Sequence, residues 1–358
     1  MEQYVLLNPG PACTSNAVKK SVELIGDVCP REVETGNLMG TISNKVTSLM
    51  TTDTDKFVSI LFTSSGTGAI ESVISSLPVN ASVLLLTNGE YGRRINEMLN
   101  IYSIVTNQLD FGNDPIDLVQ VKTELEQEIY THVITVHCET TSGIINDISA
   151  IGVIAKMHSC EFVVDAMSSA FVYPIDCNKQ QIDFLICSSN KGSQGLPGIG
   201  VVVARKESLE TCQARTMYFD LKGQYDAYIK SNQMRFTPAV QMLASFNQSL
   251  DELIEETIAG RYERYKKLNL QIRQGMKDIG FKQFIPDEHQ SIIITSFLIP
   301  ENMDFNKFHS KLKQRGFVIY PGKIEESNTF RLANIGIIEK TSIDLLLKII
   351  EVDCRLKH

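Results

Sequence analysis

Short apolar runs alternate with amphipathic stretches through the first two thirds of the 358-residue chain. The apolar runs are rich in β-branched residues, as strands are. They cover residues 57–62, 82–86, 101–105, 133–137, 162–164, 184–187 and 200–204. Stretches with the period of a helix lie between several of them, at residues 69–77, 93–100 and 117–128. This alternation predicts an α/β fold, with a mostly parallel seven-stranded sheet covered by helices on both faces. The run at 200–204 follows a turn, and we expect it to be antiparallel.

The pattern changes near residue 238, where two stretches of helical period follow each other at 239–253 and 255–277. The later runs, the last of them at 342–355, predict an α+β arrangement of about a hundred residues. We therefore expect a large domain over residues 1–245 and a smaller α+β domain over 246–358, with the N-terminal segment packing on both. The chain shows no internal repeat and no low-complexity tract.

Composition and charge are those of a globular enzyme without nucleic-acid or membrane partners. Hydrophobic residues make up 43% and charged residues 21%, which is unlike a disordered chain. The net charge of -8 argues against nucleic-acid binding, which needs clustered basic residues. No run approaches the roughly 20 apolar residues of a membrane span, and no signal peptide is visible. The eight cysteines form no CxxC pair, which favours reduced thiols over disulfides or a metal site. These features predict a cytoplasmic protein without a metal.

Three short segments carry candidate chemistry at the ends of predicted strands. The segment TSSGTGA at 63–69 precedes a helix, whose backbone N–H groups and positive end favour an anion. Its spacing is neither that of a dinucleotide loop nor that of a nucleoside triphosphate loop, and a plain capped turn is the alternative. Asp165 ends a strand at the sheet edge where ligands bind, although alone it is more simply an N-cap. Lys191 follows another strand among small residues, and alone it is more simply a solvated loop lysine.

Together, in this chain order, the three segments supply what a pyridoxal 5′-phosphate (PLP) enzyme needs. A lysine amine bonds covalently to the cofactor aldehyde, and a carboxylate keeps the pyridine nitrogen protonated. The anion cup at 63–69 holds the 5′-phosphate. One cofactor explains all three segments, so we expect PLP, with Lys191 and Asp165 as the catalytic pair.

With these residues the chain resembles the class V, fold-type-I PLP aminotransferases. The resemblance runs along nearly the whole chain. It rests on the blocks LLNPGP (6–11), CPRE (29–32), SSGT (64–67), TNGEYGRR (87–94), HCETTSG (137–143), VDAMSS (164–169), SSNK (188–191) and FRLANIG (330–336). It implies that these blocks supply the cofactor-binding residues, namely Ser65, Gly66, Thr67, Tyr91, Thr140, Asp165, Ser188 and Lys191.

The resemblance also assigns particular contacts. Tyr91 would stack on the pyridine ring, the alternative being a buried core tyrosine. Thr140 would lie near the 3′-oxygen of the cofactor. Arg331 would grip the anionic end of the substrate with its fixed fork of donors, whereas otherwise it would be an ordinary surface arginine. His137 and Glu139 share a block with Thr140, and they could tune the site. The alternative for His137 is an ordinary core histidine, and the alternative for Glu139 is a local hydrogen bond that shapes the loop.

One position departs from the family pattern. The chain reads FTPAVQ at 236–241, where the family has a threonine in place of Val240. In the family this threonine reaches across a dimer interface to the cofactor phosphate, and a valine cannot make that hydrogen bond. Thr237, Gln241 or another group would have to replace it. The family likeness still implies a homodimer with two-fold symmetry.

The resemblance implies transamination from 2-aminoethylphosphonate to pyruvate, which gives phosphonoacetaldehyde and alanine. Residue types alone support only a small anionic amine. Lys191 would move the proton, because burial beside a cationic cofactor lowers the pKa of a lysine. The alternatives are an alanine or serine aminotransferase that uses glyoxylate or pyruvate, a non-catalytic protein of the same fold, and a hydrolase that uses His137. A hydrolase is disfavoured because the chain has no G-x-S-x-G turn.

Overall fold

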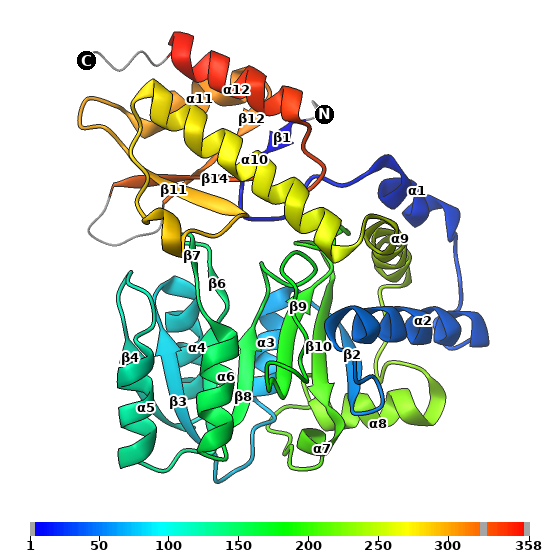
Figure 1. Ribbon diagram of the computed structural model, residues 1–358. Helices are drawn as coiled ribbons and strands as arrows, with labels where there is room; N and C mark the ends of the chain where they lie inside the picture. Colours follow the sequence, from blue (N-terminus) through cyan, green and yellow to red (C-terminus); the bar gives the residue numbers. More distant parts are fainter. Residues whose placement is uncertain (1–3, 323–327, 354–358) are drawn as a thin grey trace.

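A seven-stranded sheet forms the centre of the computed structural model, which describes residues 4–322 and 328–353 (Figure 1). The strand order is β2-β10-β9-β8-β5-β3-β4. Strand β10 runs antiparallel to β2 and β9, and the other neighbouring pairs are parallel. Both the α/β class and the reversed last strand are thus confirmed. The strands are β2 (Phe57–Thr63), β3 (Ser82–Thr87), β4 (Val105–Asp110), β5 (His132–Val136), β8 (Glu161–Asp165), β9 (Phe184–Ser188) and β10 (Ile199–Arg205).

Helices bury both faces of this sheet, because successive strand residues point to opposite sides. In β10, Val201 and Val203 join the core on one face, whereas Val202 joins the core on the other. The first core is completed by α2 (Val33–Met50), α5 (Leu118–Gln127), α6 (Ile148–Met157) and α9 (Val240–Glu256). The second is completed by α3 (Gly66–Ile74), α4 (Glu90–Ile101), α7 (Lys206–Leu209) and α8 (Leu221–Ser231). Helix α1 (Asn16–Leu24) packs on α9.

A smaller antiparallel sheet in the order β11-β14-β13 has a core of its own. The N-terminal segment joins this core, because Leu7 is fully buried in it and β1 pairs in parallel with β12. The elements are β1 (Val5–Leu6), β11 (Ile294–Leu298), β12 (Phe317–Val318), β13 (Tyr320–Pro321), β14 (Thr329–Ala333), α10 (Ile258–Ile279), η1 (Asp287–His289), α11 (Phe305–Gln314) and α12 (Lys340–Asp353). Residues 354 and 355, at the end of the last predicted run, lie outside the described residues. The expected division at 245/246 would fall within α9, and it stays a prediction.

The predicted strand at 101–105 is wrong. Ile101 ends α4, and the strand begins only at Val105 and continues to Asp110. Strand β4 lies at the edge of the sheet, and Val105 is 70% exposed. An edge strand buries fewer side chains, so its sequence is too polar to show the apolar run that marks a central strand.

The topology brings several strand ends together at the C-terminal edge of the large sheet, which is the end at which the parallel strands finish and not the outer strand β4. The carboxyl ends of β2, β5, β8 and β9 all lie there, because these strands run in the same direction. Figure 1 shows the smaller sheet and the long helix α10 above this edge. The short hairpin of β6 (Cys138–Glu139) and β7 (Ile144–Ile145) follows β5 at the same edge. No described helix is long and apolar enough to cross a membrane.

Candidate active site

A pocket of about 220 Å³ lies at this edge of the large sheet. Seven of the residues that the sequence singled out line it: Ser65, Gly66, Thr67, Tyr91, Asp165, Ser188 and Lys191. The other lining residues are Ile70, Arg94, Val136, Cys138, Met167, Ser168, Asn190 and Pro197. Thr140 and Arg331 are not among the lining residues, and they meet each other beside the pocket. The geometry therefore gathers the predicted residues from four separate stretches of chain.

The N-terminus of α3 opens into the pocket at Ser65 and Gly66. Ser65 is the N-cap residue, but its side chain makes no capping hydrogen bond. The first N–H groups of a helix have no partner within the helix, and they carry its partial positive charge. Gly66 leaves room for the end of the Met167 side chain, which would have to shift if a Cβ atom stood there. This end of α3 is therefore available to an anion.

Asp165 and Lys191 reach the pocket from the neighbouring strands β8 and β9. Asp165 is only 2% exposed, and this burial raises its pKa from 3.8 to about 6, although the Met167 N–H donates to its Oδ1 at 2.9 Å. Burial likewise lowers the pKa of Lys191 from 10.5 to about 8, against the opposing pull of the Asp165 carboxylate. The two groups favour each other's charged forms, and both titrate near neutral pH.

The N-terminal segment closes over Lys191. The Lys191 Nζ donates to the Pro9 carbonyl at 2.5 Å, and the backbone N–H of Ala12 donates to the Asn190 carbonyl at 3.2 Å. Gly10 has a φ of +136°, and a Cβ atom there would lie 2.6–2.7 Å from the Lys191 side chain. Only glycine fits this close approach. The LLNPGP block thus covers the lysine, which its sequence did not reveal.

Tyr91 stands in the first turn of α4, with Arg94 one turn further along the same helix face. The Arg94 guanidinium lies 5.1 Å from the centroid of the Tyr91 ring, within the range of a cation–π contact. Arg94 lines the pocket, and sequence reasoning missed it. The signal was present, because a pocket-facing residue on a helix is joined by the residue three positions later.

Arg331, on β14, is 1% exposed and reaches toward the pocket from the smaller sheet. Its Nη1 donates to the Thr140 carbonyl at 3.1 Å, and its Nε donates to the Pro321 carbonyl at 3.1 Å. Burial lowers the pKa of Arg331, whereas Tyr91 and Glu139 oppose that shift. The Thr140 Oγ1 is buried without a hydrogen-bond partner among the described residues. A buried hydroxyl without a partner is uncommon and points to a missing one.

The segment with the unusual valine lies elsewhere in this chain. Val240 is buried at the first turn of α9, and neither it nor Thr237 nor Gln241 lines the pocket. Gln241 instead donates to the Gly26 carbonyl at 3.4 Å.

His137 is buried as well, and burial lowers its pKa to about 3, so it stays neutral. Among the residues described, no group of three or more His, Cys, Asp or Glu side chains could hold a metal ion.

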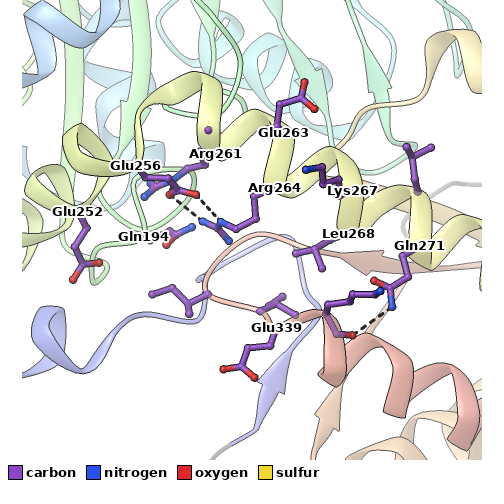
Figure 2. Close-up of a pocket in the computed structure, with 15 residues that line it drawn as sticks. Gln194, Glu252, Glu256, Arg261, Glu263, Arg264, Lys267, Leu268, Gln271 and Glu339 are labelled. Carbon is purple, nitrogen blue, oxygen red and sulfur yellow. Dashed lines mark hydrogen bonds and ion pairs between the residues drawn. The ribbon is translucent and has the colours of Figure 1, made fainter.

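A larger groove, of about 1280 Å³, lies between α10 and the loop before α12 (Figure 2). None of the predicted site residues lines it. Glu256 pairs with both Arg261 and Arg264, at 2.7 and 2.6 Å, so the two guanidiniums share one carboxylate. Figure 2 shows these side chains at the groove. Arg261 also donates to the carbonyl of Gly192, the residue after Lys191, at 2.6 Å. We therefore assign the chemistry to the smaller pocket and regard this network as a support for the lysine loop.

Comparison with known proteins shows the family of the chain. Residues 26–324 match the model of the family described as aminotransferase class-V. The chain belongs to this family. A 2-aminoethylphosphonate–pyruvate transaminase of Lysinibacillus sphaericus is 38% identical over 98% of this chain and 97% of that protein. A bifunctional phosphonoacetaldehyde hydrolase/aminoethylphosphonate transaminase of Clostridioides difficile is 39% identical over 97% of this chain, which spans 56% of that protein.

A solved structure shows the same fold as this chain. An alanine–glyoxylate aminotransferase of Nostoc superposes with a TM-score of 0.91 at 20% sequence identity, over 98% of this chain and 95% of that chain. The chain is thus a class V aminotransferase with the fold-type-I architecture. The expected family and fold are confirmed.

The pocket fits the cofactor that this family implies. The uncapped end of α3 suits a phosphate, and Asp165 at the end of β8 suits a ring nitrogen that carries a proton. The unpartnered Thr140 Oγ1 beside the pocket suits a polar oxygen of the cofactor. Each observation concerns a different part of PLP, so the fit does not depend on one contact.

Proposed function

We propose that this class V aminotransferase binds PLP in the 220 Å³ pocket and transfers the amino group of 2-aminoethylphosphonate to pyruvate. The observation that carries the proposal is the meeting of Asp165 and Lys191 in one pocket, with both pKa values shifted toward neutrality. The substrate pair is supported by the Lysinibacillus sphaericus relative, which matches nearly the full length of both chains. The products would be phosphonoacetaldehyde and alanine.

The proposal gives the lining residues separate tasks. Ser65, Gly66 and Thr67 would hold the phosphate at the end of α3, and Tyr91 would stack on the pyridine ring. Thr140 and Ser188 would contact the cofactor's polar atoms. When bound, PLP draws electrons away from the substrate carbon that bears the amino group.

Asp165 and Lys191 would handle the protons of the reaction. The Asp165 carboxylate would hold a proton on the pyridine nitrogen, because a negative charge stabilises that cation. The Lys191 Nζ would accept the proton from the amine-bearing carbon of the substrate and hold it as an ammonium group. A general base works best when its pKa lies near the working pH, and burial lowers the pKa of Lys191 to about 8.

Arg331 would hold the anionic end of the amine donor or of the oxo acid. Its fixed fork of donors matches a carboxylate or a phosphonate. Two of its donors already bind the Thr140 and Pro321 carbonyls, which orient the guanidinium. A guanidinium has five N–H groups, so donors remain for a substrate.

We also propose a homodimer in the cytoplasm. Large apolar side chains are exposed on α1, α2 and the region around α8, and a subunit contact would bury them. The exposed fractions of these side chains are 83% for Leu24, 70% for Val33, 74% for Met217 and 61% for Ile229. In such a dimer the partner copy also carries a valine at position 240, so another group would have to make the phosphate contact. The cytoplasm is supported by the cysteines, all of them unpaired among the residues described.

A donor screen tests the function. The purified protein loaded with PLP is given pyruvate and one amine at a time, and alanine formation is measured. Alanine and serine are tested with glyoxylate as the acceptor, and glycine formation is measured instead. We expect kcat/KM for 2-aminoethylphosphonate with pyruvate to exceed theirs by at least tenfold. A preference for serine or alanine with glyoxylate would replace the substrate assignment. Absence of bound PLP and of any turnover would refute the function itself.

A further inference from the structure

Glu139 is a fully buried carboxylate beside the proposed active site, and the mechanism above does not use it. It ends the short strand β6, next to the turn of the hairpin that follows β5. Buried carboxylates are uncommon, and their charge must be met by hydrogen-bond donors. The hydrogen-bond partners of its carboxylate among the described residues are all donors, so these contacts favour the ionised form.

The first of these contacts joins Glu139 to α4. The backbone N–H of Tyr91 donates to the Glu139 Oε2 at 3.0 Å, and the N–H of Gly92 faces the same carboxylate. The N-cap residue of α4, Gly89, has no side chain to cap the helix, and a Cβ atom there would collide with Glu139. Glu139 therefore caps α4 from another part of the chain. Its charge also matches the positive end of the helix.

The second set of contacts shapes the hairpin itself. The Glu139 Oε1 accepts from the Thr141 N–H at 3.1 Å and from the Thr141 Oγ1 at 2.7 Å. Burial raises the pKa of Glu139, and the donors of Thr141, Tyr91 and Gly92 lower it. One side chain thus holds both the first turn of α4 and residues 139–141.

Two side chains of the smaller sheet donate hydrogen bonds to the hairpin, at the carbonyls of Thr140 and Thr141. Arg331 donates to the Thr140 carbonyl at 3.1 Å, and the Ser296 Oγ donates to the Thr141 carbonyl at 3.1 Å. Ser296 and Arg331 are directly opposite each other in the β11–β14 pair. The hairpin next to Glu139 is therefore clamped by one cross-strand pair that includes the proposed substrate arginine.

The two helix ends at the site also differ because of Glu139. The end of α4 is filled by a carboxylate of the protein, whereas the end of α3 lacks a side-chain cap. An external anion is therefore directed to α3. The same carboxylate that excludes an anion from α4 fixes Tyr91 at the wall of the pocket.

We propose that Glu139 is a positioning residue that sets Tyr91 and Arg331 relative to each other, and so aligns the ring contact with the substrate's anionic end. The inference rests on the proposed function, in which these two residues contact the cofactor and the substrate. The competing explanation is that Glu139 only stabilises the fold.

The test compares Glu139→Gln and Glu139→Asp with the wild type. The glutamine keeps the shape but points an amide group at N–H donors, and the aspartate keeps the charge but shortens its reach. Glu90→Gln is the matched control, because Glu90 is in the same helical turn, is partly exposed and, among the described residues, pairs only with Arg93. The measurements are the PLP dissociation constant of the apoprotein, the visible circular dichroism of bound PLP, KM and kcat for the amine donor, and the melting temperature.

We expect Glu139→Gln to weaken PLP binding at least tenfold, to change the visible circular dichroism and to raise KM for the donor at least tenfold. Glu139→Asp should give intermediate values, and Glu90→Gln should match the wild type. A lower melting temperature with unchanged PLP affinity, dichroism and KM would show a structural role only and overturn the inference. Failure of both Glu139 variants to fold would overturn it too. A wild type that binds no PLP would instead refute the proposed function.

Discussion

Replacement of Asp165 by asparagine should make the apoprotein more stable while it weakens cofactor binding. Asparagine has nearly the same shape, and its Oδ1 can still accept the hydrogen bond from the Met167 N–H. What it removes is a negative charge on a side chain that is only 2% exposed. Without the cofactor that buried charge opposes folding, and with PLP bound it would pair with the ring nitrogen.

The size of the effect follows from the pKa of Asp165, which burial raises from 3.8 to about 6. A group whose pKa is raised on folding contributes stability below its unfolded pKa, and this contribution is lost as the pH rises through the folded value. A tenfold change in proton affinity corresponds to about 1.4 kcal/mol. Compared with a side chain that stays uncharged, the carboxylate therefore lowers the free energy of unfolding by about 1.5 kcal/mol at pH 5 and by about 3 kcal/mol at pH 8.

Urea unfolding of both apoproteins at pH 5 and pH 8 measures this difference. The advantage of the asparagine variant should grow by about 1.5 kcal/mol between the two pH values. With saturating PLP the order should reverse, because PLP would stabilise the wild type more. A stability difference that stays constant with pH would show that the buried carboxylate does not carry the proposed cost.

Three further substitutions test other parts of the site. Lys191→Ala should abolish both turnover and the visible absorbance of bound cofactor, and a variant that keeps both would remove Lys191 from the mechanism. Arg331→Lys keeps the charge but loses the paired donors of the guanidinium. KM for the anionic substrate should rise at least about tenfold, because hydrogen bonds to charged groups contribute about 1.5–3 kcal/mol. An unchanged KM would exclude the contact between Arg331 and the substrate. Gly66→Ala places a Cβ atom against the end of the Met167 side chain, which lines the pocket, and should weaken PLP binding about tenfold. Gly260→Ala, where a Cβ atom would make only ordinary contacts, should leave PLP binding unchanged.

Sequence reasoning proposed the parts of the candidate site that depend on local pattern. Asp165 and Lys191 could be singled out because each follows an apolar run, and such runs end at the binding edge of a parallel sheet. The anion cup at Ser65 was visible because small residues stand between a strand and a helix. Tyr91, Thr140 and Arg331 needed the family resemblance, because no local pattern distinguishes them from core or surface residues.

Other features were not predictable, because they arise between distant segments. The capping of α4 by Glu139 joins two segments that only the order of β3 and β5 in the sheet brings together. The closure of Pro9 and Gly10 over Lys191 likewise depends on where the N-terminal segment runs. The misplaced strand near Val105 had a different cause, namely an edge position that weakens the apolar signal.

The sequence by itself determined the type of fold and the chemistry at the strand ends, because backbone periodicity and residue type act over a few neighbouring positions. Only the tertiary structure decided which strand ends meet. It placed β8 beside β9, so that Asp165 and Lys191 share one pocket, and it brought Arg331 from the smaller sheet to the Thr140 carbonyl. Packing of distant segments sets these neighbours, and the burial that accompanies it shifts the two pKa values on which the proposed chemistry depends.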